Sequence, residues 1–99
     1  MRVGVLRITL RVPGARSLKE KRGPLRRLLS DLRSRGQVSA AEVDAHDAHQ
    51  RAVIGVAAVA PDGVHLSRLL AAVEDRLFHH PDLPVLDIAR DSFPGPGGP

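Results

Sequence analysis

Hydrophobic and polar residues alternate along the first stretch of the chain, from Arg2 to Val12. Leu6, Ile8 and Leu10 fall on one side of this alternation, and charged or hydroxyl-bearing residues fall on the other. A period of two over this length predicts a β-strand with one buried face and one exposed face. The dipeptide Pro13-Gly14 is expected to end it.

Two leucine-rich stretches have the spacing of amphipathic helices. The first is expected to run from Ser17 to Arg35 and the second from Val64 to His79. Ser17 is a favourable N-cap, and Glu20 lies three residues later, as a capping box requires. Gly36 is expected to stop the first helix.

The first helix is interrupted by Gly23-Pro24. An interior proline removes one helical hydrogen bond and clashes with the carbonyl four residues earlier, here that of Glu20. The leucine stripe from Leu18 to Leu32 continues through the break, which favours a kinked helix. The alternative is a helix that begins at Pro24, with proline at its first position.

Three further strands are expected, from Gln37 to Ala45, from His49 to Ala60 and from Leu83 to Arg90. Val38 and Val43 are out of phase for strict alternation, so the second strand is expected to contain a bulge or a twist. The third strand is apolar on both faces, which is typical of a central strand. The hairpin between these two strands is expected to turn at His46-Asp47-Ala48, and the last strand to place Leu86 and Ile88 in the core.

The resulting order β-α-β-β-α-β predicts a ferredoxin-like α/β sandwich of the split β-α-β type. We expect an antiparallel-rich four-stranded sheet in the order 4-1-3-2, with both helices on one face. Residues 1–91 form the single domain of this prediction, and residues 92–99 form a flexible Pro/Gly tail. The uncovered face is expected to carry a mixture of basic and small apolar residues: Val5, Arg7, Thr9, Arg11, Arg51, Val53, Gly55 and Ala57.

The whole chain has a net charge of +4. Its positive charge is concentrated in the first third of the sequence. Residues 1–35 contain eleven Lys or Arg and two acids, and residues 36–99 contain four Arg and nine acids. Such asymmetry favours a polyanionic partner, nucleic acid first, although a solvated helix face is the alternative. Phosphates would bind at the helix N-terminus and on the nearby side chains. The candidate nucleic-acid contacts are Arg16, Lys19, Lys21, Arg22, Arg26 and Arg27, with Arg7 and Arg11 from the first strand.

Other kinds of site find little support. The chain has no Cys, Trp or Tyr, and Phe78 and Phe93 are expected in the second helix and the tail, so base stacking on a sheet is not expected. The pair His46 and His49 lacks the second ligand set of a structural zinc site. Glu42 and Asp44 are expected to share one face of an edge strand, facing solvent or paired with Arg51. We expect no catalytic residue, cofactor, metal or small-molecule substrate. No stretch is apolar and long enough to cross a membrane, and we expect a cytoplasmic protein.

Several segments together resemble the YlxP-like family of small uncharacterised bacterial proteins, over about residues 1–91. They are Pro13 to Arg22 (Pro-Gly-Ala-Arg-Ser-Leu-Lys-Glu-Lys-Arg), Val38 to Asp44 (Val-Ser-Ala-Ala-Glu-Val-Asp), Asp47, Gln50-Arg51-Ala52 and Leu86-Asp87-Ile88. The resemblance implies a ferredoxin-like fold. Members are often encoded beside genes for translation initiation and ribosome maturation, which implies work on RNA or the ribosome and assigns no catalytic residue.

Two hypotheses follow. In the first, the protein associates with RNA or a ribosomal particle through its basic first helix and acts by binding. In the second, it is a homodimer or a protein–protein interaction module that uses the open sheet face and binds no nucleic acid.

Overall fold

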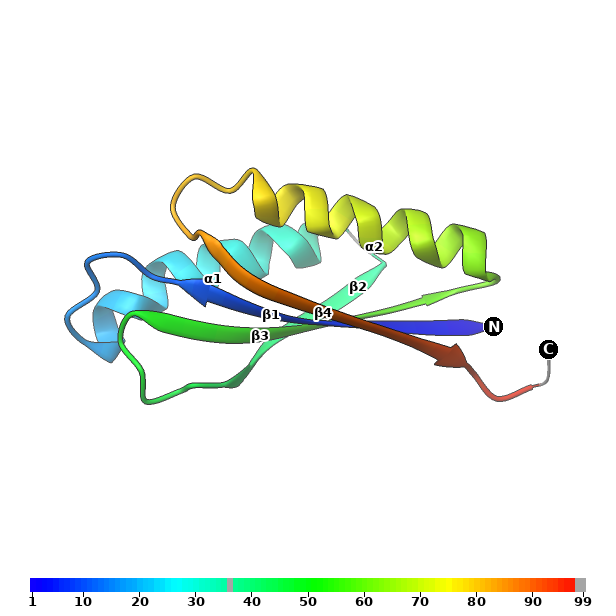
Figure 1. Cartoon of the computed structure of the whole chain (residues 1–99), viewed down its shortest axis with the longest axis horizontal. Helices are drawn as coiled ribbons and strands as arrows, with labels where there is room; N and C mark the ends of the chain where they lie inside the picture. The colour runs from blue at the N-terminus through cyan, green and yellow to red at the C-terminus, as the bar shows by residue number, and fades with distance from the viewer. Residues whose placement is uncertain (36, 98–99) are drawn as a thin grey trace.

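The computed structural model describes residues 1–35 and 37–97, which form a two-layer α/β sandwich (Figure 1). The described strands make an antiparallel sheet in the order β2-β3-β1-β4, and both helices lie on the same side of it. The predicted ferredoxin-like architecture and strand order are therefore confirmed. In chain order, the elements are β1 (Arg2–Arg11), α1 (Leu18–Ser34), β2 (Val38–Asp44), β3 (Arg51–Ala60), α2 (Gly63–Phe78) and β4 (Val85–Pro94).

The core lies between the sheet and the two helices. Leu6, Ile8 and Leu10 of β1 are each at most 2% exposed, as their alternation predicted. Both helices direct a leucine stripe at this face, which removes apolar surface from water and provides the main stabilisation. α2 packs especially close to β1 at Gly4, where a Cβ would lie 2.8 Å from a methyl carbon of Leu70. A larger residue would therefore collide with the core.

α1 is one helix through Gly23-Pro24, so it begins after the Ser17 cap and not at Pro24. The Ser17 hydroxyl accepts a hydrogen bond from the backbone N–H of Glu20, at 3.1 Å. The helix ends at Ser34, with Arg35 as the C-cap. The predicted stop at Gly36 lies outside the described residues. No helix in the described part of the chain is both long and apolar enough to span a membrane.

The β2–β3 hairpin contains the expected bulge. Glu42 pairs with Ile54 and Asp44 pairs with Val53, so Val43 is the extra residue. This insertion reverses the alternation, because a one-residue shift moves each later side chain to the other face. Glu42 and Asp44 therefore do not share a face, and this prediction is wrong.

β4 differs most from the sequence prediction. A second register shift lies opposite Thr9 and Leu10, where Leu86 is the extra residue and stays 58% exposed. Leu86 is thus not a core residue, and Leu83, just before the strand, is buried instead. The strand also continues through Ser92, Phe93 and Pro94, residues that the sequence assigned to the tail. Pro94 is tolerated because β4 is an edge strand, where a missing N–H leaves no ladder bond unmade.

Candidate nucleic-acid interface

The N-terminus of α1 is closed by its own side chains. Glu20 reaches back so that its Oε2 accepts a hydrogen bond from the Arg16 N–H at 2.6 Å, while the Ser17 hydroxyl accepts from the Glu20 N–H. This is a variant of the capping box, in which the acid binds the residue before the N-cap. A phosphate at this helix end would have to displace the Glu20 carboxylate. Backbone N–H groups are therefore weaker candidates for phosphate contacts than the side chains along the helix.

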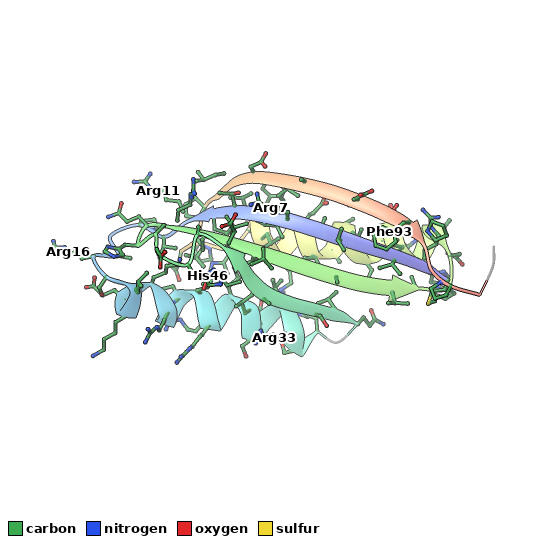
Figure 2. All side chains as sticks on the ribbon, turned by 90° about the horizontal axis from the view of Figure 1, so that it is seen from below. Arg7, Arg11, Arg16, Arg33, His46 and Phe93 are labelled. Atoms are coloured by element: carbon green, nitrogen blue, oxygen red, sulfur yellow. The ribbon has the colours of Figure 1, made fainter. Side chains whose placement is uncertain are left out.

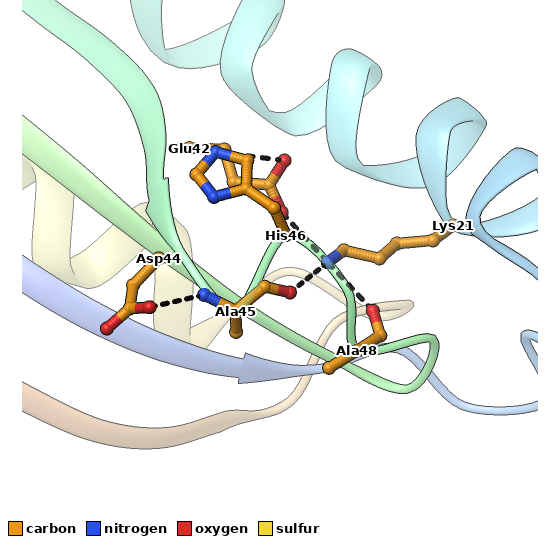
Figure 3. Close-up of polar contacts among 6 residues, drawn as sticks. All are labelled: Lys21, Glu42, Asp44, Ala45, His46 and Ala48. Atoms are coloured by element: carbon orange, nitrogen blue, oxygen red, sulfur yellow. Dashed lines mark hydrogen bonds and ion pairs between the residues drawn. The ribbon is translucent and has the colours of Figure 1, made fainter.

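Lys21, one of the candidate contact residues, is not on the surface. Its side chain is 3% exposed and points from α1 to the β2–β3 hairpin (Figure 3). Its Nζ donates hydrogen bonds to the carbonyl oxygens of Ala45 and Ala48, both at 2.9 Å. It also lies 2.8 Å from Oε2 of Glu42, a contact that is ionic but not directed as a hydrogen bond. The assignment of Lys21 to the interface is corrected: the ammonium is held by this chain's own groups.

The burial of Lys21 has a signal in the sequence. Residue 21 precedes Leu25 by four positions and Leu28 by seven, so it lies on the buried stripe of α1. Its hydrocarbon stem can pack with the leucines, and its ammonium donates to two backbone carbonyls of the hairpin. The acceptors come from a loop whose path the sequence does not give.

The side chains of Glu42 and Asp44, the two acids of β2, lie on different faces of the sheet. Glu42 is turned toward α1 and Lys21, and its Oε1 lies 3.9 Å from Nε2 of His46. Asp44 is on the open face, where its Oδ2 accepts from Arg7 at 2.9 Å. The backbone N–H of Ala45 and the Arg7 guanidinium hold the pKa of Asp44 below its usual value. The expected exposure to solvent holds for Asp44, and the alternative pairing with Arg51 is replaced by pairing of Glu42 with Lys21 and of Asp44 with Arg7.

The other predicted contacts near α1 are exposed; one comes just before the helix and four lie in it. We call Arg16, Lys19, Arg22, Arg26 and Arg27 the α1 basic surface; all five are exposed. Among residues 1–35 and 37–97, their side chains make no ion pair or hydrogen bond. The helix's other acid, Asp31, is bound to Arg76 of α2 by contacts of 2.6–2.9 Å. Figure 2 shows nitrogen-tipped side chains that project from α1 away from the sheet. This surface can attract polyanions because its charge is not neutralised within the fold.

The two β1 candidates, Arg7 and Arg11, lie on the other side of the sheet from α1 (Figure 2). Arg7 is occupied by Asp44, and the register places Arg11 directly opposite Arg51. Arg11 and Arg16 lie toward the same end of the molecule, so cations from both faces approach that end (Figure 2). Arg51 was not among the predicted contacts, because only the strand register places it beside Arg11.

The part of the chain that the structure describes also bears on the other kinds of site considered above. In the described part of the chain, no three His, Cys, Asp or Glu side chains gather in a way that could hold a metal ion, and this includes the region of His46 and His49. Phe93 is 44% exposed and lies opposite Val3 on the open face, not in a tail. The open face therefore carries an aromatic side chain that the sequence analysis did not place there.

Comparison with known proteins places the chain in a family without assigning an activity. No curated protein matches it. Residues 3–90 match the model of DUF503, described as a protein of unknown function. This match spans both helices and most of β4, so the protein belongs to the DUF503 family.

Proposed function

We propose that the protein binds RNA, as part of its association with a ribosomal particle in the cytoplasm, through the α1 basic surface. The observation that carries this proposal is that five exposed cations follow one helix without an acid bound to any of them in the described residues. The nearby acids are engaged elsewhere: Glu20 with the Arg16 N–H, Asp31 with Arg76. The YlxP-like resemblance, with its gene neighbourhood in translation, gives independent support.

The mode of binding follows from the side chains that are present. Modules that read single-stranded RNA on a sheet stack two or three bases on aromatic residues. The open face here offers Phe93, at the end of β4 that is remote from Arg11 (Figure 2). Guanidinium and ammonium groups on α1 instead suit phosphate contacts, which position RNA without reading its sequence. The protein therefore acts by binding and recognises the shape and charge of its RNA.

Phosphate-led binding has a defined salt dependence. If all five cations each neutralise one phosphate, the slope of log K against log salt is about −3.5 for single-stranded RNA. Raising the salt concentration from 50 to 200 mM then weakens binding by about 100-fold. Co-sedimentation with purified ribosomal subunits, and fluorescence anisotropy with a labelled ribosomal RNA fragment, measure this at both salt concentrations.

Charge-reversal variants distinguish RNA binding by the α1 basic surface from attraction by the net charge of the whole protein. Arg26→Glu on α1 should weaken RNA binding by about tenfold and reduce the salt slope by about one. Arg68→Glu on α2 makes the same change of charge on the other helix, at an exposed residue, and should have a much smaller effect. The triple variant Lys19→Glu, Arg22→Glu, Arg26→Glu should abolish co-sedimentation. Equal effects of Arg26→Glu and Arg68→Glu, or retained binding by the triple variant, would refute the proposal.

A further inference from the structure

The sheet face opposite the helices exposes a group of apolar side chains on one half of its surface. Val43 is 52% exposed, Val59 58% and Phe93 44%, and Val3 and Val5 are half-buried between them. The strand registers place Val3 opposite both Val59 and Phe93, so these side chains form a row across three strands. The largest exposed apolar patch of a small protein is often an interaction site. We call this row, with Val5 and Val43, the open apolar face.

The open apolar face has both projections and a hollow. A shallow hollow of about 300 Å³ lies over β2 and β3, lined by Val5, Ala41, Val43 and Gly55 among others. Gly55 has no side chain to fill the hollow. The side chain of the bulged residue Val43 lies over it, since a Cβ on Gly55 would be 2.9 Å from a Val43 methyl carbon. Val59 and Phe93 project from the neighbouring strands. A surface with projections beside a hollow can complement a copy of itself, which is what a two-fold interface requires.

The other half of the open face carries charges of both signs. Arg7, Arg11 and Arg51 lie there with Asp44 and Asp87, and Asp91, opposite Val5, brings one carboxylate to the edge of the open apolar face. A strongly acidic partner would be repelled by the aspartates of this half, and a strongly basic partner would be repelled by its arginines. A second copy brings the same mixture and can place cations against acids at the rim, where charge fixes orientation.

The whole open face, with its apolar and charged halves together, reaches the size that a dimer needs. β1 and β3 have ten residues each, and with about 3.3 Å per residue and about 4.8 Å between strands the sheet covers about 600 Å². Two copies would bury about 1,200 Å² in total, which is the lower bound of stable interfaces. We propose that a second copy of this chain docks on the whole open face, the open apolar face and the charged half together, so that the two sheets pack face to face with the helices outside. Such packing aligns the strands of the two sheets within about 30°.

This dimer is independent of the proposed RNA binding. α1 lies on the opposite side of the sheet (Figure 1), so its basic surface would stay free in both copies. The dimer is therefore measured on nuclease-treated protein, without RNA. Failure of one proposal leaves the other in place.

The test is sedimentation equilibrium or light scattering between 1 and 500 μM protein in about 0.3 M salt, with matched variants. Wild-type protein should reach twice the 10.6 kDa of a single chain. Val59→Asp on β3 and Phe93→Asp on β4 should each weaken dimerisation at least tenfold. Val64→Asp and Phe78→Asp are the controls, because these α2 side chains are 62% and 64% exposed and lie on the helix side. The controls should leave the dimer unchanged.

Circular dichroism should show that all four variants keep the fold. A mass of 10.6 kDa at every concentration would overturn the proposal. So would a dimer that survives both Val59→Asp and Phe93→Asp, or one that the α2 variants disrupt equally. A monomer that instead binds a different protein through this face would also overturn it.

Discussion

Replacing Lys21 by methionine removes the ammonium group that joins α1 to the β2–β3 hairpin and keeps most of the side-chain volume. Two backbone carbonyls and one carboxylate lose their cationic partner (Figure 3). A buried acceptor left without a partner costs about 1–3 kcal/mol, and loss of one member of a fully buried ion pair costs about 3–5 kcal/mol. Two features reduce these values here. The Ala45 carbonyl keeps its hydrogen bond from the Ala48 N–H, and the Glu42 side chain is 23% exposed, so water can reach it.

We therefore expect Lys21→Met to lower the free energy of unfolding by about 2–3 kcal/mol, within the range of disrupted buried networks. For a domain of this size the midpoint of thermal unfolding falls by about 10–20 °C. Urea unfolding followed by circular dichroism measures the change, with equal m values required for the comparison.

Lys19→Met is the matched control. Lys19 lies two residues away on the exposed side of α1 and makes no ion pair among the described residues, so its replacement should change stability by less than about 0.5 kcal/mol. The double variant Lys21→Met, Glu42→Leu should recover part of the loss, because it removes the stranded carboxylate as well. Equal stability of Lys21→Met and Lys19→Met would refute the assignment of Lys21 as a buried connection.

Three other stability changes follow from the structure. Gly4→Ala should lower stability by about 1–3 kcal/mol, since its Cβ would collide with Leu70 in the core, as urea unfolding would show. Gly63→Ala, where a Cβ meets no atom within 4 Å, should instead raise stability by about 0.4–1 kcal/mol; a loss there would contradict this account. The hydrogen bonds from Arg76 hold the pKa of Asp31 below its usual value, so this pair stabilises the fold at higher pH and loses its effect as the pH falls through the lowered pKa. Asp31→Asn should therefore lower stability at pH 7 by less than about 1 kcal/mol, because both side chains are more than a third exposed, and should flatten the acid side of the pH profile; an unchanged profile would contradict this.

The architecture was predictable because long periodic segments determine it. The alternation of β1 and the leucine stripes of both helices each extend over ten or more residues, and the β-α-β-β-α-β order then permits few topologies. A single residue that departs from the period does not change the type of element that such a long pattern predicts. Of the two bulges, the one at Val43 was expected from its phase. The one at Leu86 was not, because the strand around it offers few apolar residues to fix the phase.

The positive charge of the candidate interface was predictable from the sequence. Which basic residues belong to it was not. A basic residue in a helix is normally exposed, and this holds for Arg16, Lys19 and Arg22. Lys21 is the exception, because backbone carbonyls that only the folded hairpin brings together provide its acceptors. Arg51 lies on the open face, as predicted, but that it stands directly opposite Arg11 is known only from the strand register. Both depend on contacts between segments that are far apart in the sequence.

The extension of β4 to Pro94 has a practical result for handling the protein. Gly95 donates a hydrogen bond to the carbonyl oxygen of Met1, at 2.9 Å, so the first residue and the end of the last strand are neighbours. The molecule is 48 Å long, and Figure 1 shows the N-terminus at the opposite end from the start of α1. Affinity tags, fluorophores or surface anchors attached after Gly95 would emerge far from Arg16. Attachment at Met1 would disturb its neighbours more, because Met1 also packs against Gly95.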